Sequence, residues 1–101
     1  MNIILMKKKV ISILKRAQKK AQKRKYALYV KDDTHNYVFV SNKQYKQLKL
    51  FFTPMLWRVA SNGTIEEFNT LCEILYNPNI RTSPHLFLDK QIGILLNIAS
   101  H

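Results

Sequence analysis

The chain has 101 residues, of which 47% are hydrophobic, and it carries 17 Lys and Arg against six Asp and Glu. This length fits one domain, and the apolar content is enough for a packed core, which excludes wholesale disorder. No stretch approaches the roughly 18 apolar residues of a membrane-spanning helix, and a single cysteine excludes an internal disulfide framework. We therefore expect a cytoplasmic protein, or one that acts in the cytoplasm of a host cell.

The positive charge is concentrated at the beginning of the chain. Ten of the 17 basic residues lie in the first 25 positions, which contain no acidic residue, and they account for nearly all of the net charge of +11. The remaining 76 residues carry seven basic and six acidic groups. We therefore divide the single domain into a basic helix over residues 1–25 and a compact α+β body over residues 26–101.

Residues 3–24 show the hydrophobic period of an amphipathic helix. At about 100° per residue, seven apolar side chains fall within roughly a third of the circumference: Ile3, Met6, Val10, Ile13, Leu14, Ala17 and Ala21. On the opposite side lie Lys8, Lys15, Arg16, Lys19 and Lys23. The stripe weakens from Ile and Leu to Ala along the helix, so we expect its first half to dock on the domain and its second half to project.

Residues 26–30 and 37–40 are rich in aromatic and β-branched residues, and a polar cluster over residues 32–36 separates them. This pattern predicts a β-hairpin. Alternation along the strands places three aromatic rings and two cations on one face: Tyr29, Tyr37 and Phe39 with Lys25 and Lys31. Such a face would form a stacking platform for nucleic-acid bases. The alternative is that the rings pack beneath the helices.

Two capping boxes mark the beginnings of further helices. Ser41 is followed three residues later by Gln44, and Thr64 in the same way by Glu67. The first helix is expected to end before Pro54. The second is expected over residues 65–76, and its spacing predicts four buried side chains: Ile65, Phe68, Cys72 and Leu75.

Between these helices, residues 55–60 alternate with the two-residue period of a strand, which predicts a third strand there. The end of the chain allows two interpretations. Either a helix begins at Ser83 and Pro84, or residues 86–88 form a short strand before a helix over residues 89–99. That terminal helix is apolar nearly all round, so it lies in the centre of the core or against a partner or second copy.

These patterns together predict an α+β fold. It would consist of an N-terminal basic amphipathic helix and a small antiparallel sheet, made of the hairpin and the third strand, covered by helices.

The basic helix suits a polyanionic partner. Lys and Arg that neutralise phosphates release condensed counterions, which gives affinity without sequence information. The excess of Lys over Arg in this helix favours backbone contacts over base reading. Other interpretations are a merely solvated face, an acidic protein surface, and an anionic membrane surface. We do not expect a membrane, because residues 1–25 contain no Trp or Phe.

Little in the sequence points to catalysis. Gly63 and Gly93 are the only glycines, so there is no glycine-rich phosphate loop. The three histidines are scattered without the spacing of metal ligands, and Cys72 lies at the spacing of a buried, neutral core thiol. We therefore expect no catalytic residue, no metal and no cofactor.

The sequence thus predicts a non-catalytic nucleic-acid-binding protein that occupies RNA, or a ribonucleoprotein, through its basic helix. The residues expected at this interface are Lys8, Lys15, Arg16, Lys19, Lys20, Lys23, Arg24, Lys25, Lys31, Tyr29, Tyr37 and Phe39. The alternative is an inhibitor that binds a host protein and places the basic helix in an acidic or nucleic-acid-binding channel of that target.

A lone, short, lysine-rich domain without a catalytic motif resembles the small proteins encoded by phages and mobile elements, among them anti-CRISPR inhibitors. The resemblance lies in overall character and in no residue motif. It implies a CRISPR effector ribonucleoprotein or its guide RNA as the target, with the nucleic-acid channel or guide-RNA loading blocked. Because such a target contains both protein and RNA, the resemblance is compatible with both hypotheses.

Overall fold

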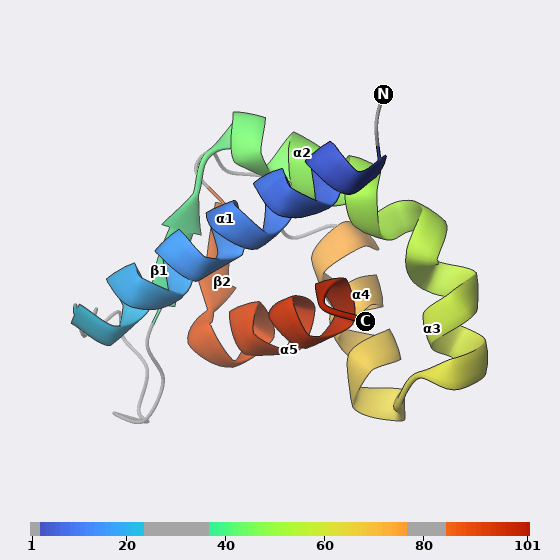
Figure 1. Ribbon diagram of the computed structural model, residues 1–101. Helices are drawn as coiled ribbons and strands as arrows, with labels where there is room; N and C mark the ends of the chain where they lie inside the picture. The colour runs from blue at the N-terminus through green and yellow to red at the C-terminus, as the bar shows by residue number, and fades with distance from the viewer. Residues whose placement is uncertain (1–2, 24–36, 77–84) are drawn as a thin grey trace.

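The computed structural model describes residues 3–23, 37–76 and 85–101, and most of these are helical (Figure 1). The elements in chain order are α1 (Ile3–Lys23), β1 (Tyr37–Val40), α2 (Asn42–Phe52), the 3-10 turn η1 (Thr53–Met55), α3 (Leu56–Asn62), α4 (Ile65–Tyr76), β2 (His85–Leu88) and α5 (Asp89–Ala99). The predicted α+β class is wrong. Within the described ranges, the strands form a two-stranded ribbon and not a sheet covered by helices.

The terminal helix α5 lies in the core, which agrees with one of its two predicted positions. It packs against α1, α4 and β2, and Figure 1 shows α1 crossing the molecule beside it. Neighbours on several sides explain why the helix is apolar nearly all round. Its fully buried side chains are Ile92, Leu95, Ile98 and Ala99.

The amphipathic helix predicted over residues 3–24 is confirmed as α1. Val10, Leu14 and Ala17 are buried, while Met6 and Ile13 are half-buried against the core. The burial of Ala17 shows that docking continues into the second half of the helix, farther than predicted. A small side chain still contributes here, because it removes apolar surface from water without holding the two elements apart.

Both capping boxes are confirmed. The Ser41 hydroxyl accepts from the Gln44 N–H and the Gln44 side chain accepts from the Ser41 N–H, each at 3.2 Å. At the start of α4, the Thr64 N–H donates to Glu67 Oε1 at 2.9 Å and the Glu67 N–H donates to Thr64 Oγ1 at 3.0 Å. Each box satisfies backbone donors that have no partner within the first turn.

The strand over residues 37–40 is confirmed, and its partner comes from near the other end of the chain. β1 pairs with β2 in antiparallel register, with Tyr37 opposite Leu88 and Val40 opposite His85. A short strand followed by a helix over residues 89–99 is therefore the correct interpretation of the chain's end. The other half of the predicted hairpin, residues 26–30, lies outside the described residues.

The third strand predicted over residues 55–60 is wrong, because this segment is helical in η1 and α3. The alternation expected of a strand would put Trp57 and Val59 on the same face. In the structure Trp57 is 84% exposed and Val59 is buried, as two positions 200° apart on a helix would be. Pro54 contributes to this outcome, since its fixed φ suits the first turn of a helical segment.

The inner face of α4 is rotated from its predicted position. Leu75 is buried as expected, but Phe68 and Cys72 are only half-buried and Ile65 is 81% exposed. The buried side chains of α4 are Thr70, Leu71, Ile74 and Leu75. The helix packs against α2, α3 and α5. Contacts with these three neighbours, and not a single apolar stripe, determine which side chains of α4 are buried.

Tyr45 joins three elements of the core. Its hydroxyl donates to the backbone carbonyl of Ile74 at 2.8 Å, which ties α2 to α4. Its ring meets the ring of Phe87 on β2 edge to face, with centroids 6.2 Å apart. Burial raises the pKa of the Tyr45 hydroxyl, so this group stays protonated and keeps its role as a donor.

Candidate nucleic-acid interface

The outward face of α1 carries the cations that its period predicts. The side chains of Lys8, Lys15, Arg16 and Lys19 are exposed, on the side of the helix away from the buried Val10 and its neighbours. Lys9 and Lys20 are exposed as well, while Lys7 is half-buried beside the apolar stripe. Docking of α1 therefore fixes the orientation of most of its cations, because a helix buried on one side presents its other side to solvent.

A second set of cations comes from α2, and the sequence analysis missed it. Lys43, Lys46 and Lys49 are all exposed on this helix, which packs beside α1. Their spacing of three residues, in a helix without Asp or Glu, is a signal that the sequence does contain. We call the exposed cations of the two helices the basic surface: Lys8, Lys9, Lys15, Arg16, Lys19, Lys20, Lys43, Lys46 and Lys49.

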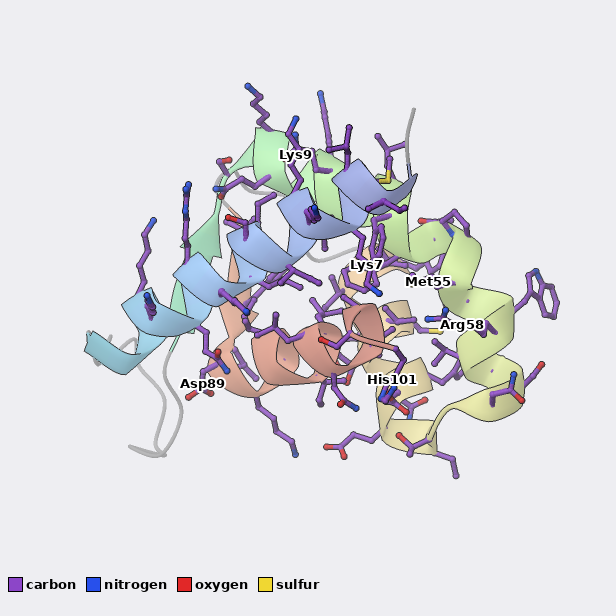
Figure 2. The ribbon with its side chains drawn as sticks, in the orientation of Figure 1. Lys7, Lys9, Met55, Arg58, Asp89 and His101 are labelled. Carbon is purple, nitrogen blue, oxygen red and sulfur yellow. The ribbon has the colours of Figure 1, made fainter. Side chains whose placement is uncertain are left out.

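The acidic residues of the described chain lie elsewhere. Glu66, Glu67 and Glu73 belong to α4 and Asp89 begins α5. In Figure 2, Lys9 lies above α1, whereas Asp89 lies below it, where α5 begins. Since neither α1 nor α2 contains an acidic residue, the cations of the basic surface have no carboxylate on their own helices to neutralise them. The described part of the molecule is thus electrically asymmetric.

We call the acidic residues of α4 and α5 (Glu66, Glu67, Glu73 and Asp89) the acidic side, and two of them form contacts within the fold. Glu66 forms an ion pair with Lys90 at 3.2 Å between exposed side chains, and Asn97 donates to Glu67 Oε2 at 3.4 Å. Hydrogen bonds from the backbone N–H of Thr64, then from its hydroxyl and from Asn97, lower the pKa of Glu67. These carboxylates therefore serve helix starts and contacts within the fold.

Part of the predicted interface lies outside the described residues. This holds for Arg24, Lys25, Tyr29 and Lys31, and for the side chain of Lys23 at the end of α1. Tyr37 and Phe39 belong to β1, whose backbone pairing is described while their side chains are not. The structure thus brings together the α1 cations, adds those of α2, and leaves the aromatic platform a prediction.

The structure adds no metal-binding arrangement to this surface. In the described ranges, no three His, Cys, Asp or Glu side chains gather as a metal site requires. Cys72, predicted to be buried, is a half-buried free thiol on α4. None of the helices in the described ranges is both long and apolar enough to cross a membrane.

Comparison with known proteins gave no relative. The chain matches no protein-family model, no curated protein and no solved structure. The residues of the basic surface are therefore the basis for assigning a function to this chain.

Proposed function

We propose that this protein is a non-catalytic nucleic-acid-binding protein that occupies RNA, either free or within a ribonucleoprotein, through the basic surface of α1 and α2. The observation that supports this most is the segregation of charge: two neighbouring helices carry exposed cations and no carboxylate. Like charges at neighbouring helix positions destabilise a helix. A binding partner of opposite charge would account for two helices with cations and no carboxylate, whereas solubility alone does not require this segregation.

The chemistry of the cations favours the phosphate backbone. Eight of the nine residues in the basic surface are Lys, whose ammonium is a compact, flexible charge, and only Arg16 offers the planar fork that reads guanine bidentately. We therefore expect affinity that depends on charge and salt, with little preference among sequences.

The length of the surface fits a stretch of polyanion. Lys8 and Lys19 are eleven residues apart on the same helix, which corresponds to about 16 Å at the rise of an α-helix. Duplex nucleic acid of B form carries roughly one charge per 1.7 Å of axis, so several phosphates lie within reach of α1 alone. The α2 lysines widen the surface sideways.

RNA is the nucleic acid to test first. In the predicted platform, the rings of Tyr29, Tyr37 and Phe39 would stack on unpaired bases beside these cations. Sequence-tolerant recognition of single strands combines such rings with a basic groove.

The experiment is a titration of labelled single-stranded RNA, duplex RNA and duplex DNA at several salt concentrations. It compares the natural protein with a triple variant, Lys8→Glu, Lys15→Glu and Lys19→Glu, and with a matched control in which the same three residues become Arg. We expect sub-micromolar affinity that falls steeply with salt, a loss of at least about a hundredfold in the Glu variant, and nearly unchanged affinity in the Arg variant.

Weak binding that is alike in all three proteins contradicts the proposal. The basic surface would then serve the alternative function, that of a phage or mobile-element inhibitor acting on a host protein. In that event, a tight complex with the target should survive nuclease treatment.

A further inference from the structure

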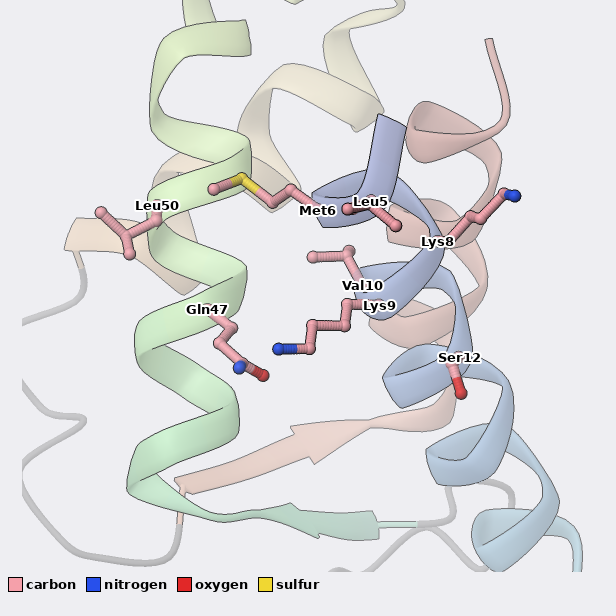
Figure 3. Close-up of a pocket in the computed structure, with 8 residues that line it drawn as sticks. All are labelled: Leu5, Met6, Lys8, Lys9, Val10, Ser12, Gln47 and Leu50. Carbon is pink, nitrogen blue, oxygen red and sulfur yellow. The ribbon is translucent and has the colours of Figure 1, made fainter. Parts of the chain in front are cut away.

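An apolar groove lies between α1 and α2, next to the basic surface (Figure 3). It has a volume of about 510 Å³, and its wall is mostly apolar, formed by Leu5, Met6 and Val10 of α1 and Leu50 of α2. Leu5 is 62% exposed and Leu50 is 61% exposed. Two exposed leucines on the helices that form one apolar groove differ from the scattered apolar residues of an ordinary surface, and they indicate a binding site.

The polar part of the groove is basic. Lys8 and Lys9 line it from α1, and Figure 3 shows the Lys9 side chain extending toward Gln47 of α2. Because neither helix carries an acidic residue, an occupant of this groove meets positive charge beside an apolar surface. The complementary ligand is therefore both apolar and anionic.

We propose that this groove binds an amphipathic helix of a partner protein, one whose apolar stripe is flanked by Asp or Glu. Leu5 to Ser12 covers two turns of α1, or about 10 Å, which matches anchors at positions i, i+3 or i+4 and i+7 of a bound helix. An acidic flank of that helix would face Lys9, whose side chain extends into the space between α1 and α2 (Figure 3).

Two other occupants fit the observations less well. A nucleic-acid backbone is polar and charged throughout, so it would cover the basic surface without filling an apolar wall. A second copy of this chain would bring together two molecules of net charge +11, whose mutual repulsion opposes association. An acidic helix gains from both the apolar contact and the charge.

The test uses three designed helical peptides of about four turns, or ~14 residues. One has a leucine stripe flanked by Glu, one has the same composition with the stripe scrambled, and one has Lys in place of Glu. Each is titrated against the natural protein, against Leu50→Gln in the groove, and against the matched control Ile65→Gln, whose side chain is 81% exposed on α4. Circular dichroism of each variant confirms that it is folded.

We expect the acidic stripe peptide to bind at least about tenfold more tightly than either other peptide. Leu50→Gln should weaken that binding by about tenfold, and Ile65→Gln should leave it unchanged. Equal binding of the striped and scrambled acidic peptides would overturn the proposal, since charge alone would then explain it. So would an unchanged affinity in Leu50→Gln.

Two further measurements address the other occupants. The first is cosedimentation with vesicles of phosphatidylglycerol, and the second is self-association in analytical ultracentrifugation. If the striped peptide does not bind and either of these signals depends on Leu50, the groove belongs to a membrane or to a second copy, and the proposal is overturned. Leu50→Gln leaves every cation in place, so RNA affinity should be unchanged in it. The proposal of a docking groove and the proposal of nucleic-acid binding can therefore be contradicted independently of each other.

Discussion

α1 and α5 pack against each other, but they use their surfaces differently. α5 carries one acidic and one basic residue and is surrounded by other elements, so packing accounts for most of its sequence. α1 is buried along one face, and its 21 residues include eight Lys and Arg without an acidic residue. Docking explains the apolar face of α1 and leaves its charged face unexplained. The comparison separates the residues of α1 that packing explains from its exposed cations, which our proposal assigns to contacts with a partner.

The largest expected effect tests whether the two helices share one core. Leu14 of α1 and Leu95 of α5 are both fully buried, so replacing either by Ala should lower the free energy of unfolding by about 2–5 kcal/mol. Urea denaturation at neutral pH measures both. A Leu14→Ala loss below about 1 kcal/mol, beside a full loss for Leu95→Ala, would show that α1 is not part of the core.

A smaller effect tests the part of the basic surface that sequence analysis missed. Replacing Lys43, Lys46 and Lys49 of α2 together by Ala should weaken RNA binding by about tenfold and reduce the salt dependence, since each lost phosphate contact removes about 0.7 from the slope for single strands. Because all three side chains are exposed, stability should hardly change. Unchanged affinity would restrict the interface to α1.

Removing the capping hydroxyl of either box should lower the stability of the protein without changing its RNA affinity. Ser41→Ala at the start of α2 and Thr64→Ala at the start of α4 should each lower the free energy of unfolding by about 1 kcal/mol. Thermal or urea unfolding measures the loss. Both variants should retain the RNA affinity of the natural protein when folded, and a fall in affinity for Ser41→Ala alone would mean that this end of α2 belongs to the interface.

The smallest effect concerns the acidic side and depends on pH. The Thr64 backbone N–H, first among several hydrogen-bond donors, lowers the pKa of Glu67 in the folded protein. The ionised form therefore adds stability above the usual glutamate pKa, and this contribution is lost as the pH falls through the lowered value. Comparing urea unfolding of the natural protein and Glu67→Gln across the acidic range should show a difference that shrinks as the pH falls. A difference that grows instead would contradict this assignment.

Local signals predicted the helices well. The α1 stripe and the Ser41 and Thr64 capping boxes placed three helices correctly, because each signal lies within a few neighbouring residues. The pairing of β1 with β2 joins segments from distant parts of the chain, so no local pattern could reveal it. The strand prediction over residues 55–60 is wrong for a related reason. Six residues hold too few repeats to separate a strand period from a helical one, so contacts with the rest of the fold determine the conformation.

The candidate site was predicted in part. The α1 lysines follow from period and charge alone. The contribution of α2 required knowing that α2 packs beside α1, because three lysines on an ordinary surface helix mean little by themselves. The groove between the two helices is equally a property of packing, since Leu5 and Leu50 belong to separate elements.

The central claim is that the position of the charge, and not its amount, determines binding. Two double variants test this directly: Lys15→Glu with Lys19→Glu on α1, and Arg58→Glu with Lys90→Glu on α3 and α5. Both change the net charge equally, and all four side chains are exposed. At about 0.15 M salt, we predict that the α1 variant loses RNA affinity by at least about thirtyfold while the other stays within about threefold of the natural protein. Equal losses in the two variants would contradict the claim.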